Sequence, residues 1–211
     1  SHAFPDRRGE AREHLDLTLS RFWPRINSMT GLSDALLPLV RPQLEVASEA
    51  PRLVFISGAQ GIGKSTALKA ALSRLDANVC GLGIDDFYLP KADRLALARH
   101  VHPLFETRGP PGTHDVALLL ETLSALQTAR SSSHIQLPLF SKAADDRLPE
   151  THDWHGRPDI IIVEGWLMGV DADPSSPESA PLNAVEARDE TGDWRRFQEK
   201  QLAGAYARLW D

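Results

Sequence analysis

The stretch that most constrains the fold of this chain is GAQGIGKST, residues 58–66. It matches the pattern G-x-x-x-x-G-K-[ST] and lies between an apolar run, residues 53–57, and a helical pattern over residues 65–75. A strand, a glycine-rich turn and a helix in this order let backbone N–H groups surround a phosphate at the helix N-terminus. We therefore predict a nucleotide-binding loop. The alternative is a glycine-rich turn that matches the pattern by chance.

The loop assigns a role to each of its polar side chains. Lys64 is expected to reach the β- and γ-phosphate oxygens, and the Ser65 hydroxyl is expected to bind Mg²⁺. ATP and Mg²⁺ are therefore the expected ligands. The predicted nucleotide-binding residues are Gly58, Ala59, Gln60, Gly61, Ile62, Gly63, Lys64, Ser65 and Thr66.

Two further apolar runs, residues 79–84 and 159–166, read as buried strands. Helical patterns over residues 91–101, 115–130 and 193–210 alternate with the strands, and residues 134–140 read as an extended edge segment broken by Pro138. This alternation predicts an α/β three-layer P-loop NTPase fold with a mostly parallel sheet. Such sheets bind ligands at the carboxyl ends of their strands, where the loops 58–65, 85–88 and 164–166 are expected to meet.

The N-terminal part of the chain carries two further helical patterns, residues 10–28 and 33–47, the second of them interrupted by Pro38 and Pro42. We expect residues 1–50 to form a helical extension and residues 51–211 to form a single domain.

Acidic residues follow two of the predicted strands. Glu164, at the end of one, is placed to hold Mg²⁺ or its water shell, the alternative being an ordinary strand-end acid. Asp85 and Asp86 end another strand and point in different directions, so that one can face the site while the other caps the loop. We expect Asp85 to be the general base and Lys64, Asp85 and Glu164 to be the catalytic residues.

Cations gather in two later loops. The rigid segment RGPPGTHD presents Arg108 and His114, and SKAADDR supplies Lys142 and Arg147. Together they form a reasonable receptor for a small anion, unless they are ordinary solvated surface charges. The histidines show no zinc-site spacing, so no structural zinc is expected.

Charge and composition narrow the function classes. The formal net charge of −6 gives no electrostatic support to nucleic-acid binding. No apolar run approaches the length of a membrane span. The single cysteine, Cys80, excludes an intrachain disulfide and indicates a cytoplasmic setting. We expect the chain to be a monomer or a homodimer.

Taken together, GAQGIGKST, GIDDFYLP, HPLFETRGPPGTHD, LPLFSKAADDR, VEGWLMG and PLNAVE resemble the D-glycerate 3-kinase family. This is the plant-and-fungal-type glycerate kinase with its bacterial relatives, within the phosphoribulokinase/uridine kinase-like P-loop kinases. The resemblance runs from about Arg52 to the C-terminus and makes residues 51–211 a kinase domain. It implies transfer of the ATP γ-phosphoryl group to a hydroxyl of D-glycerate, a small anionic hydroxy acid, giving 3-phosphoglycerate.

The same resemblance implies an acceptor site and leaves alternatives open. A kinase for a nucleoside, pantothenate or a sugar acid is one alternative, and a nucleotide-binding module without catalysis is another. Ser141 stands where relatives often have aspartate, and the C-terminal strand and lid of related kinases are not found after Asp193. The acceptor-binding residues implied are Asp85, Tyr88, Arg108, His114, Asp115, Lys142, Asp146 and Arg147.

Overall fold

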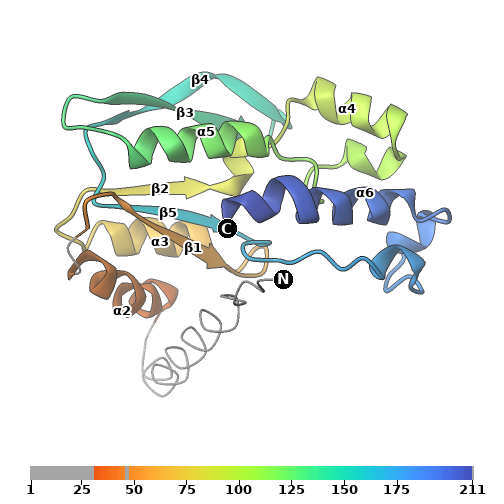
Figure 1. Ribbon diagram of the computed structural model, residues 1–211, viewed down its shortest axis with the longest axis horizontal. Helices are drawn as coiled ribbons and strands as arrows, with labels where there is room; N and C mark the ends of the chain where they lie inside the picture. Colours follow the sequence, from red (N-terminus) through yellow and green to blue (C-terminus); the bar gives the residue numbers. More distant parts are fainter. Residues whose placement is uncertain (1–30, 46–47, 211) are drawn as a thin grey trace, which may run out of the picture.

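The fold is taken from a computed structural model, which describes residues 31–45 and 48–210 (Figure 1). The helix predicted over residues 10–28 lies outside the described residues. At the centre is a parallel sheet in the order β1-β5-β2, formed by β1 (Arg52–Ser57), β5 (Ile160–Gly165) and β2 (Val79–Gly83). The apolar run of β5 explains its central place in the sheet. Its residues 160–163 are fully buried, because β1 and β2 flank the strand and helices cover both of its faces.

Helices cover both faces of this sheet, as the three-layer prediction requires (Figure 1). α2 (Leu32–Glu45) and α3 (Lys64–Leu72) pack on one face, where they share a core with Ile160 and Ile162. α5 (Val116–Gln127) and the turns that follow α6 (Asp193–Gln201) cover the other face, against Ile161 and Val163. The alternation of these four residues follows from the two-residue period of a strand.

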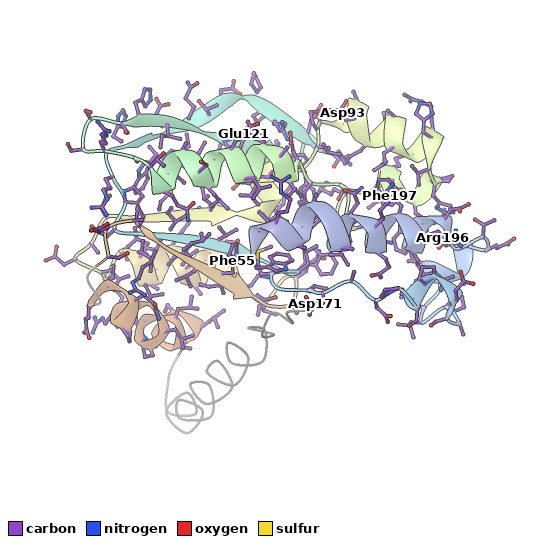
Figure 2. All side chains as sticks on the ribbon, in the orientation of Figure 1. Phe55, Asp93, Glu121, Asp171, Arg196 and Phe197 are labelled. Carbon is purple, nitrogen blue, oxygen red and sulfur yellow. The ribbon has the colours of Figure 1, made fainter. Side chains whose placement is uncertain are left out.

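Aromatic side chains pack on the side of the sheet that α6 and the turns after it cover (Figure 2). Phe55 on β1 meets the ring of Trp210 edge to face, with 6.2 Å between ring centroids. Phe197 on α6 contacts Phe105 in the same way at 5.1 Å. These contacts hold the C-terminal segment onto the sheet and onto the loops above it, where the candidate site lies.

A hairpin completes the fold, and it corrects one expectation. β3 (His134–Ser141) pairs with β4 (Asp146–His155) in an antiparallel two-stranded sheet, with a bulge between Pro138 and Phe140. Arg147, which is expected in a loop, lies in β4, a strand that no pattern in the sequence predicts. β4 is difficult to recognise because most of its side chains are exposed and polar, so it lacks an apolar signal.

The remaining elements match the predicted helices with shifted ends. α2 runs through Pro38 and Pro42 without a break, because burial of Leu36, Leu37 and Val40 against α3 stabilises it. α4 spans Lys91–His100, and the predicted C-terminal helix changes to a π-helical turn at Leu202–Tyr206 and a 3₁₀ turn at Ala207–Leu209. Within residues 31–45 and 48–210, no helix combines the length and hydrophobicity needed to span a bilayer.

Candidate active site

A cleft of about 560 Å³ opens at the carboxyl ends of the three parallel strands. The loops after β1, β2 and β5 all contribute to it, and the hairpin turn between β3 and β4 adds Lys142. The cleft therefore lies where a sheet of this topology binds ligands. Its lining residues are Gln60, Gly61, Gly63, Lys64, Ser65, Thr66, Asp85, Tyr88, Thr107, Arg108, Lys142, Glu164, Gly165 and Trp166.

The loop after β1 has the backbone that its glycines predict. Gly61 and Gly63 adopt positive φ angles of 77° and 87°, which residues with a Cβ atom rarely adopt. α3 begins directly afterwards at Lys64, so that its N-terminal N–H groups open toward the cleft. This end of the cleft is therefore suited to an anionic phosphate group.

Lys64, Ser65 and Glu164 lie together on the side of the cleft next to this loop. The Lys64 Nζ donates to the Ala59 carbonyl oxygen at 2.9 Å, which holds the ammonium group back over the loop. The Ser65 hydroxyl donates to Glu164 Oε1 at 2.5 Å, although the two residues lie 99 positions apart. Parallel pairing of β1 with β5 creates this contact, because both strands end at the same edge of the sheet.

Glu164 is buried, with 9% of its surface exposed, and in the described part of the chain it forms no ion pair. A second carboxylate lies close by: a Cβ atom built on Gly83 would be 3.4 Å from Glu164 Oε1 and 3.5 Å from Asp86 Oδ2. A buried and a half-buried carboxylate beside a serine hydroxyl are a suitable oxygen donor set for a hard divalent cation. The residues present therefore fit the predicted Mg²⁺ at Ser65 and Glu164.

Asp85 and Asp86 diverge, as predicted, from a 3₁₀ turn at Ile84–Phe87 that follows β2. Asp85 enters the cleft and forms an ion pair with Lys142, with 2.7 Å between Oδ2 and Nζ. Asp86 does not line the cleft, and its Oδ1 accepts a hydrogen bond from the Phe140 N–H at 3.4 Å, which joins the turn to β3. Because Asp86 also approaches Glu164, it is a candidate site residue to which the sequence analysis assigned only a role in the loop.

The environments of the two acids move their pKa values in opposite directions. Burial acts to raise the pKa of Asp85, but the hydrogen bond and charge of Lys142, with a hydrogen bond from Tyr88, lower it overall. Burial raises the pKa of Asp86, and the charge of Asp85 adds to this effect. The ionised form is therefore stabilised in the acid that faces the cleft, as a base for a hydroxyl proton requires.

Arg108 reaches the cleft from the loop before α5 and is held from behind. Its Nη1 lies 2.5 Å from Asp145 Oδ1 in the hairpin turn. Asp145 has a positive φ of 55° and also pairs with Arg94, whose Nη2 lies 3.0 Å from the same oxygen. Burial acts to raise the pKa of Asp145, but its hydrogen bonds to Arg108 and Arg94 lower it overall.

Arg94 links this arrangement to the protein interior. Its side chain is fully buried, and its guanidinium donates to the backbone carbonyls of Leu89, Glu106 and Asp145. One buried side chain thus ties α4, the loop before Arg108 and the hairpin turn together. Neither Arg94 nor Asp145 was singled out from the sequence, because their role depends on contacts that no local pattern reveals.

His114 is buried behind the cleft and does not line it. Its ring stacks on Tyr88, with 4.3 Å between centroids, and its Nδ1 lies 2.6 Å from the Tyr206 hydroxyl. That hydroxyl accepts from the Gly112 N–H at 3.1 Å, so its own proton is directed to Nδ1 and the imidazole proton is assigned to Nε2. Burial lowers the pKa of His114 to about 3, which keeps it neutral.

Three more residues that were predicted to bind the phosphoryl acceptor do not line the cleft. Arg147 Nη2 donates to the Tyr88 carbonyl at 2.9 Å and pairs with Asp115 at 3.1 Å, while Asp115 also caps α5 through the Leu118 N–H. Asp146 Oδ1 accepts from the Lys91 N–H at 2.8 Å, at the start of α4. These contacts give all three a positioning role in this structure.

Of the predicted acceptor residues, Asp85, Tyr88, Arg108 and Lys142 come together in the cleft. Thr107 and Trp166 line it as well. Thr107 carried no sequence signal beyond its place next to Arg108. Trp166 comes directly after β5, two residues beyond Glu164. This position at the end of a parallel strand was the signal that could have identified it as a cleft residue.

The chain is similar to several known proteins in sequence and in fold. No protein-family model matches the chain. It is 32% identical over 175 residues to "Uncharacterized kinase mug58" of Schizosaccharomyces pombe, covering 77% of this chain and 61% of that protein. It is 28% identical over 131 residues to a pantothenate kinase of Shewanella halifaxensis, covering 57% and 37% respectively.

Among solved structures, D-glycerate 3-kinase from Cryptococcus neoformans matches with a TM-score of 0.70 and 25% identity, over 87% of this chain and 71% of that one. The chain spans less than two thirds of the length of both curated relatives. All three of these proteins are named as kinases, and two of the names give a substrate, pantothenate in one and D-glycerate in the other. The chain is thus similar in sequence to proteins named as kinases and similar in fold to a D-glycerate 3-kinase.

Proposed function

We propose that this chain is an ATP-dependent kinase that transfers the γ-phosphoryl group to a hydroxyl of a small hydroxy acid, with D-glycerate as the first candidate. One observation carries the proposal: an ionised carboxylate, Asp85, and two cations, Arg108 and Lys142, share a single cleft with the phosphate-binding loop. A phosphoryl donor, a base and a receptor for an acid are thus combined at one edge of the sheet.

The nucleotide half of the cleft binds the donor. The glycine-rich loop and the start of α3 receive the phosphates, and Lys64 turns from the Ala59 carbonyl to their oxygens. Ser65 and Glu164 would hold Mg²⁺, which, when bound, offsets the negative charge that develops on the phosphate oxygens. Burial of Glu164 excludes water from this side and strengthens its attraction to a cation.

The acceptor half supplies the base. Asp85 takes the proton of the acceptor hydroxyl, whose oxygen forms the new bond to phosphorus as the bond from phosphorus to the ADP oxygen breaks. Lys142 leaves Asp85 for the carboxylate of the acceptor, which frees Asp85 to bind the hydroxyl. Because Lys142 is well exposed, with a relative side-chain accessibility of 65%, this movement needs no change in the core.

The charges of the acceptor half favour an acid as the substrate. Arg108 is fixed by Asp145 and can bind a carboxylate with two parallel N–H groups. A nucleoside would offer no carboxylate to these cations and would need a stacking surface for its base. The fold similarity to a D-glycerate 3-kinase supports glycerate as the first acceptor to test.

Pantothenate is the second candidate. It carries both a hydroxyl and a carboxylate, so the same cations would bind it, and one relative is named a pantothenate kinase. Its longer chain would have to fit a cleft of about 560 Å³ that also holds the triphosphate. A nucleotide-binding module without catalysis remains the alternative from a different class.

Turnover with a panel of acceptors tests the proposal. ADP formation from Mg²⁺ and ATP would be measured with D-glycerate, L-glycerate, pantothenate, uridine and a sugar acid, and the product would be identified by ³¹P NMR. We expect D-glycerate to stimulate ADP formation and to give 3-phosphoglycerate. Stimulation by pantothenate or uridine alone would contradict the glycerate assignment, and ATP binding without stimulation by any acceptor would favour the binding module.

A further inference from the structure

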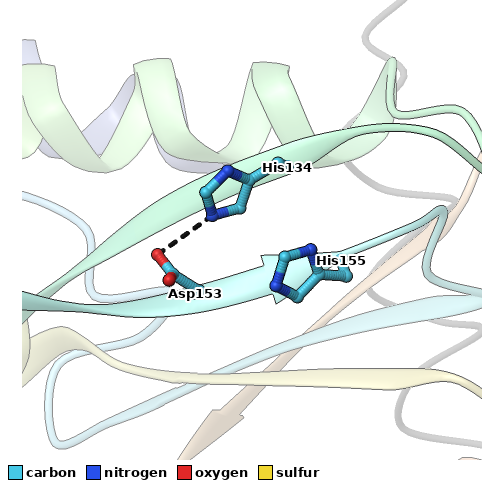
Figure 3. A group of neighbouring side chains, drawn as sticks. All are labelled: His134, Asp153 and His155. Carbon is cyan, nitrogen blue, oxygen red and sulfur yellow. Dashed lines mark ion pairs between the residues drawn. The ribbon is translucent and has the colours of Figure 1, made fainter.

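A second cluster of ligand-type side chains lies on the hairpin, at the end of the strands opposite to the turn that lines the cleft. His134 begins β3 and is paired in register with His155, the last residue of β4. Asp153 lies two residues before His155 and therefore on the same face of β4. Figure 3 shows the three side chains together on the outer face of the hairpin.

The geometry of the three donor atoms suits a metal ion. The His134 Nε2 lies 3.0 Å from Asp153 Oδ1, and one donor atom from each of the three residues lies within 4.8 Å of the others. Ligands of a tetrahedral zinc ion at 2.0–2.1 Å stand about 3.3 Å apart. His155 is exposed, so its ring can turn to bring its donor atom closer to the other two.

The two imidazole rings are stacked, with their centroids 4.6 Å apart and their planes differing by 6°. One ring therefore has to turn before both rings direct a nitrogen at the same ion, but their backbone positions already place the two side chains next to each other. The opposite face of the hairpin fixes this arrangement, because Ile135 and Trp154 pack against the core. The backbone positions of the ligands are therefore set by folding, before any ion binds.

We propose that His134, Asp153 and His155 form a surface site for a divalent transition metal such as zinc, with water completing the coordination. Two neutral imidazoles and one carboxylate are a ligand set that zinc accepts and that magnesium disfavours, so this site differs in chemistry from Ser65 and Glu164. The proposal revises the expectation of no zinc, since the ligands come together only through the pairing of β3 with the unpredicted β4. It does not depend on the proposed kinase function.

Zinc titration of the full chain without an affinity tag tests the site. The protein would first be dialysed against a chelator, and binding of Zn²⁺ would then be measured by calorimetry without nucleotide. The variants are His134→Ala and His155→Ala, and the matched control is His152→Ala. His152 is also exposed and lies in β4, but its side chain is on the opposite face of the strand from Asp153 and His155. All three positions are exposed, so the variants are expected to fold.

We expect one zinc ion per chain in the unmodified protein and in His152→Ala, and binding at least about tenfold weaker in each of the two other variants. X-ray absorption of the zinc complex should show two imidazole ligands. Equal binding by the unmodified protein and His134→Ala, or no binding by either, would overturn the proposal, and His134 and Asp153 would then form only a surface ion pair.

Discussion

The two halves of the cleft are built in different ways. The nucleotide half comes from loops that continue directly from β1 and β5, and its key contact, Ser65 to Glu164, follows from parallel strand pairing. The acceptor half depends on ion pairs between loops and the β3–β4 hairpin, such as Arg108 with Asp145 and Lys142 with Asp85. The comparison teaches that a local motif defines the proposed donor site, whereas tertiary contacts define the proposed acceptor site.

The nucleotide half can be disabled at a single residue. We expect Lys64→Ala to weaken ATP binding and to lower turnover by roughly 10³-fold or more, because the transferred group loses its main cation. Lys69→Ala, on the exposed face of the same helix, is the control and should leave both unchanged. Isothermal titration with ATP and an ADP-release assay would check this, and turnover retained in Lys64→Ala would argue against a phosphate role for this loop.

Arg94 lies behind the acceptor half and supports it, so its substitution should lower the stability of the protein. Arg94→Met removes a fully buried guanidinium and leaves three backbone carbonyls without their donor. We expect the free energy of unfolding to fall by about 2–4 kcal/mol. Urea unfolding measures this, with the exposed Arg99→Met as a control expected to change by less than about 0.5 kcal/mol. A similar small change in Arg94→Met would contradict its role as the link between α4, the loop and the hairpin.

Arg108 and Arg147 distinguish contact with the acceptor from support. Arg108 lines the cleft, so Arg108→Ala should raise the acceptor KM about 10–100-fold while the ATP KM stays the same. Arg147 contacts Tyr88 and Asp115 outside the lining, so Arg147→Ala should raise the acceptor KM less. Steady-state kinetics with both substrates would decide between them. A larger effect of Arg147→Ala would mean that it binds the acceptor directly.

The smallest expected effect concerns acid stability. Burial lowers the pKa of His114 to about 3, whereas the ordinary value is 6.5. The unfolded chain therefore binds a proton that the folded chain does not between pH 6.5 and 3, and the free energy of unfolding falls as the pH falls through this range. From pH 7 to 5.5 the unmodified protein should lose about 1 kcal/mol more than His114→Gln in urea unfolding. An equal loss in unfolding free energy for the two proteins would indicate that the pKa of His114 is not lowered in the folded protein.

The sequence predicted the parallel sheet, its covering helices and the three loops at its edge, since apolar strands and a complete phosphate-loop motif are strong local signals. It did not predict β4, because that strand is polar and mostly exposed. The roles of Asp145 and Arg94 could not be predicted from the sequence for a related reason. Their importance comes from contacts across the chain, and an isolated aspartate or arginine in the sequence carries no sign of burial or pairing.

The central claim is that Asp85 acts on the acceptor and not on the nucleotide. The most direct test is to measure ATP binding and acceptor-dependent turnover of Asp85→Asn side by side, with Asp93→Asn on α4 as an exposed control. We predict that ATP affinity is kept while turnover falls by roughly 10²–10⁴-fold, the range for loss of a general base. Retained turnover, or loss of ATP binding together with turnover, would contradict the claim.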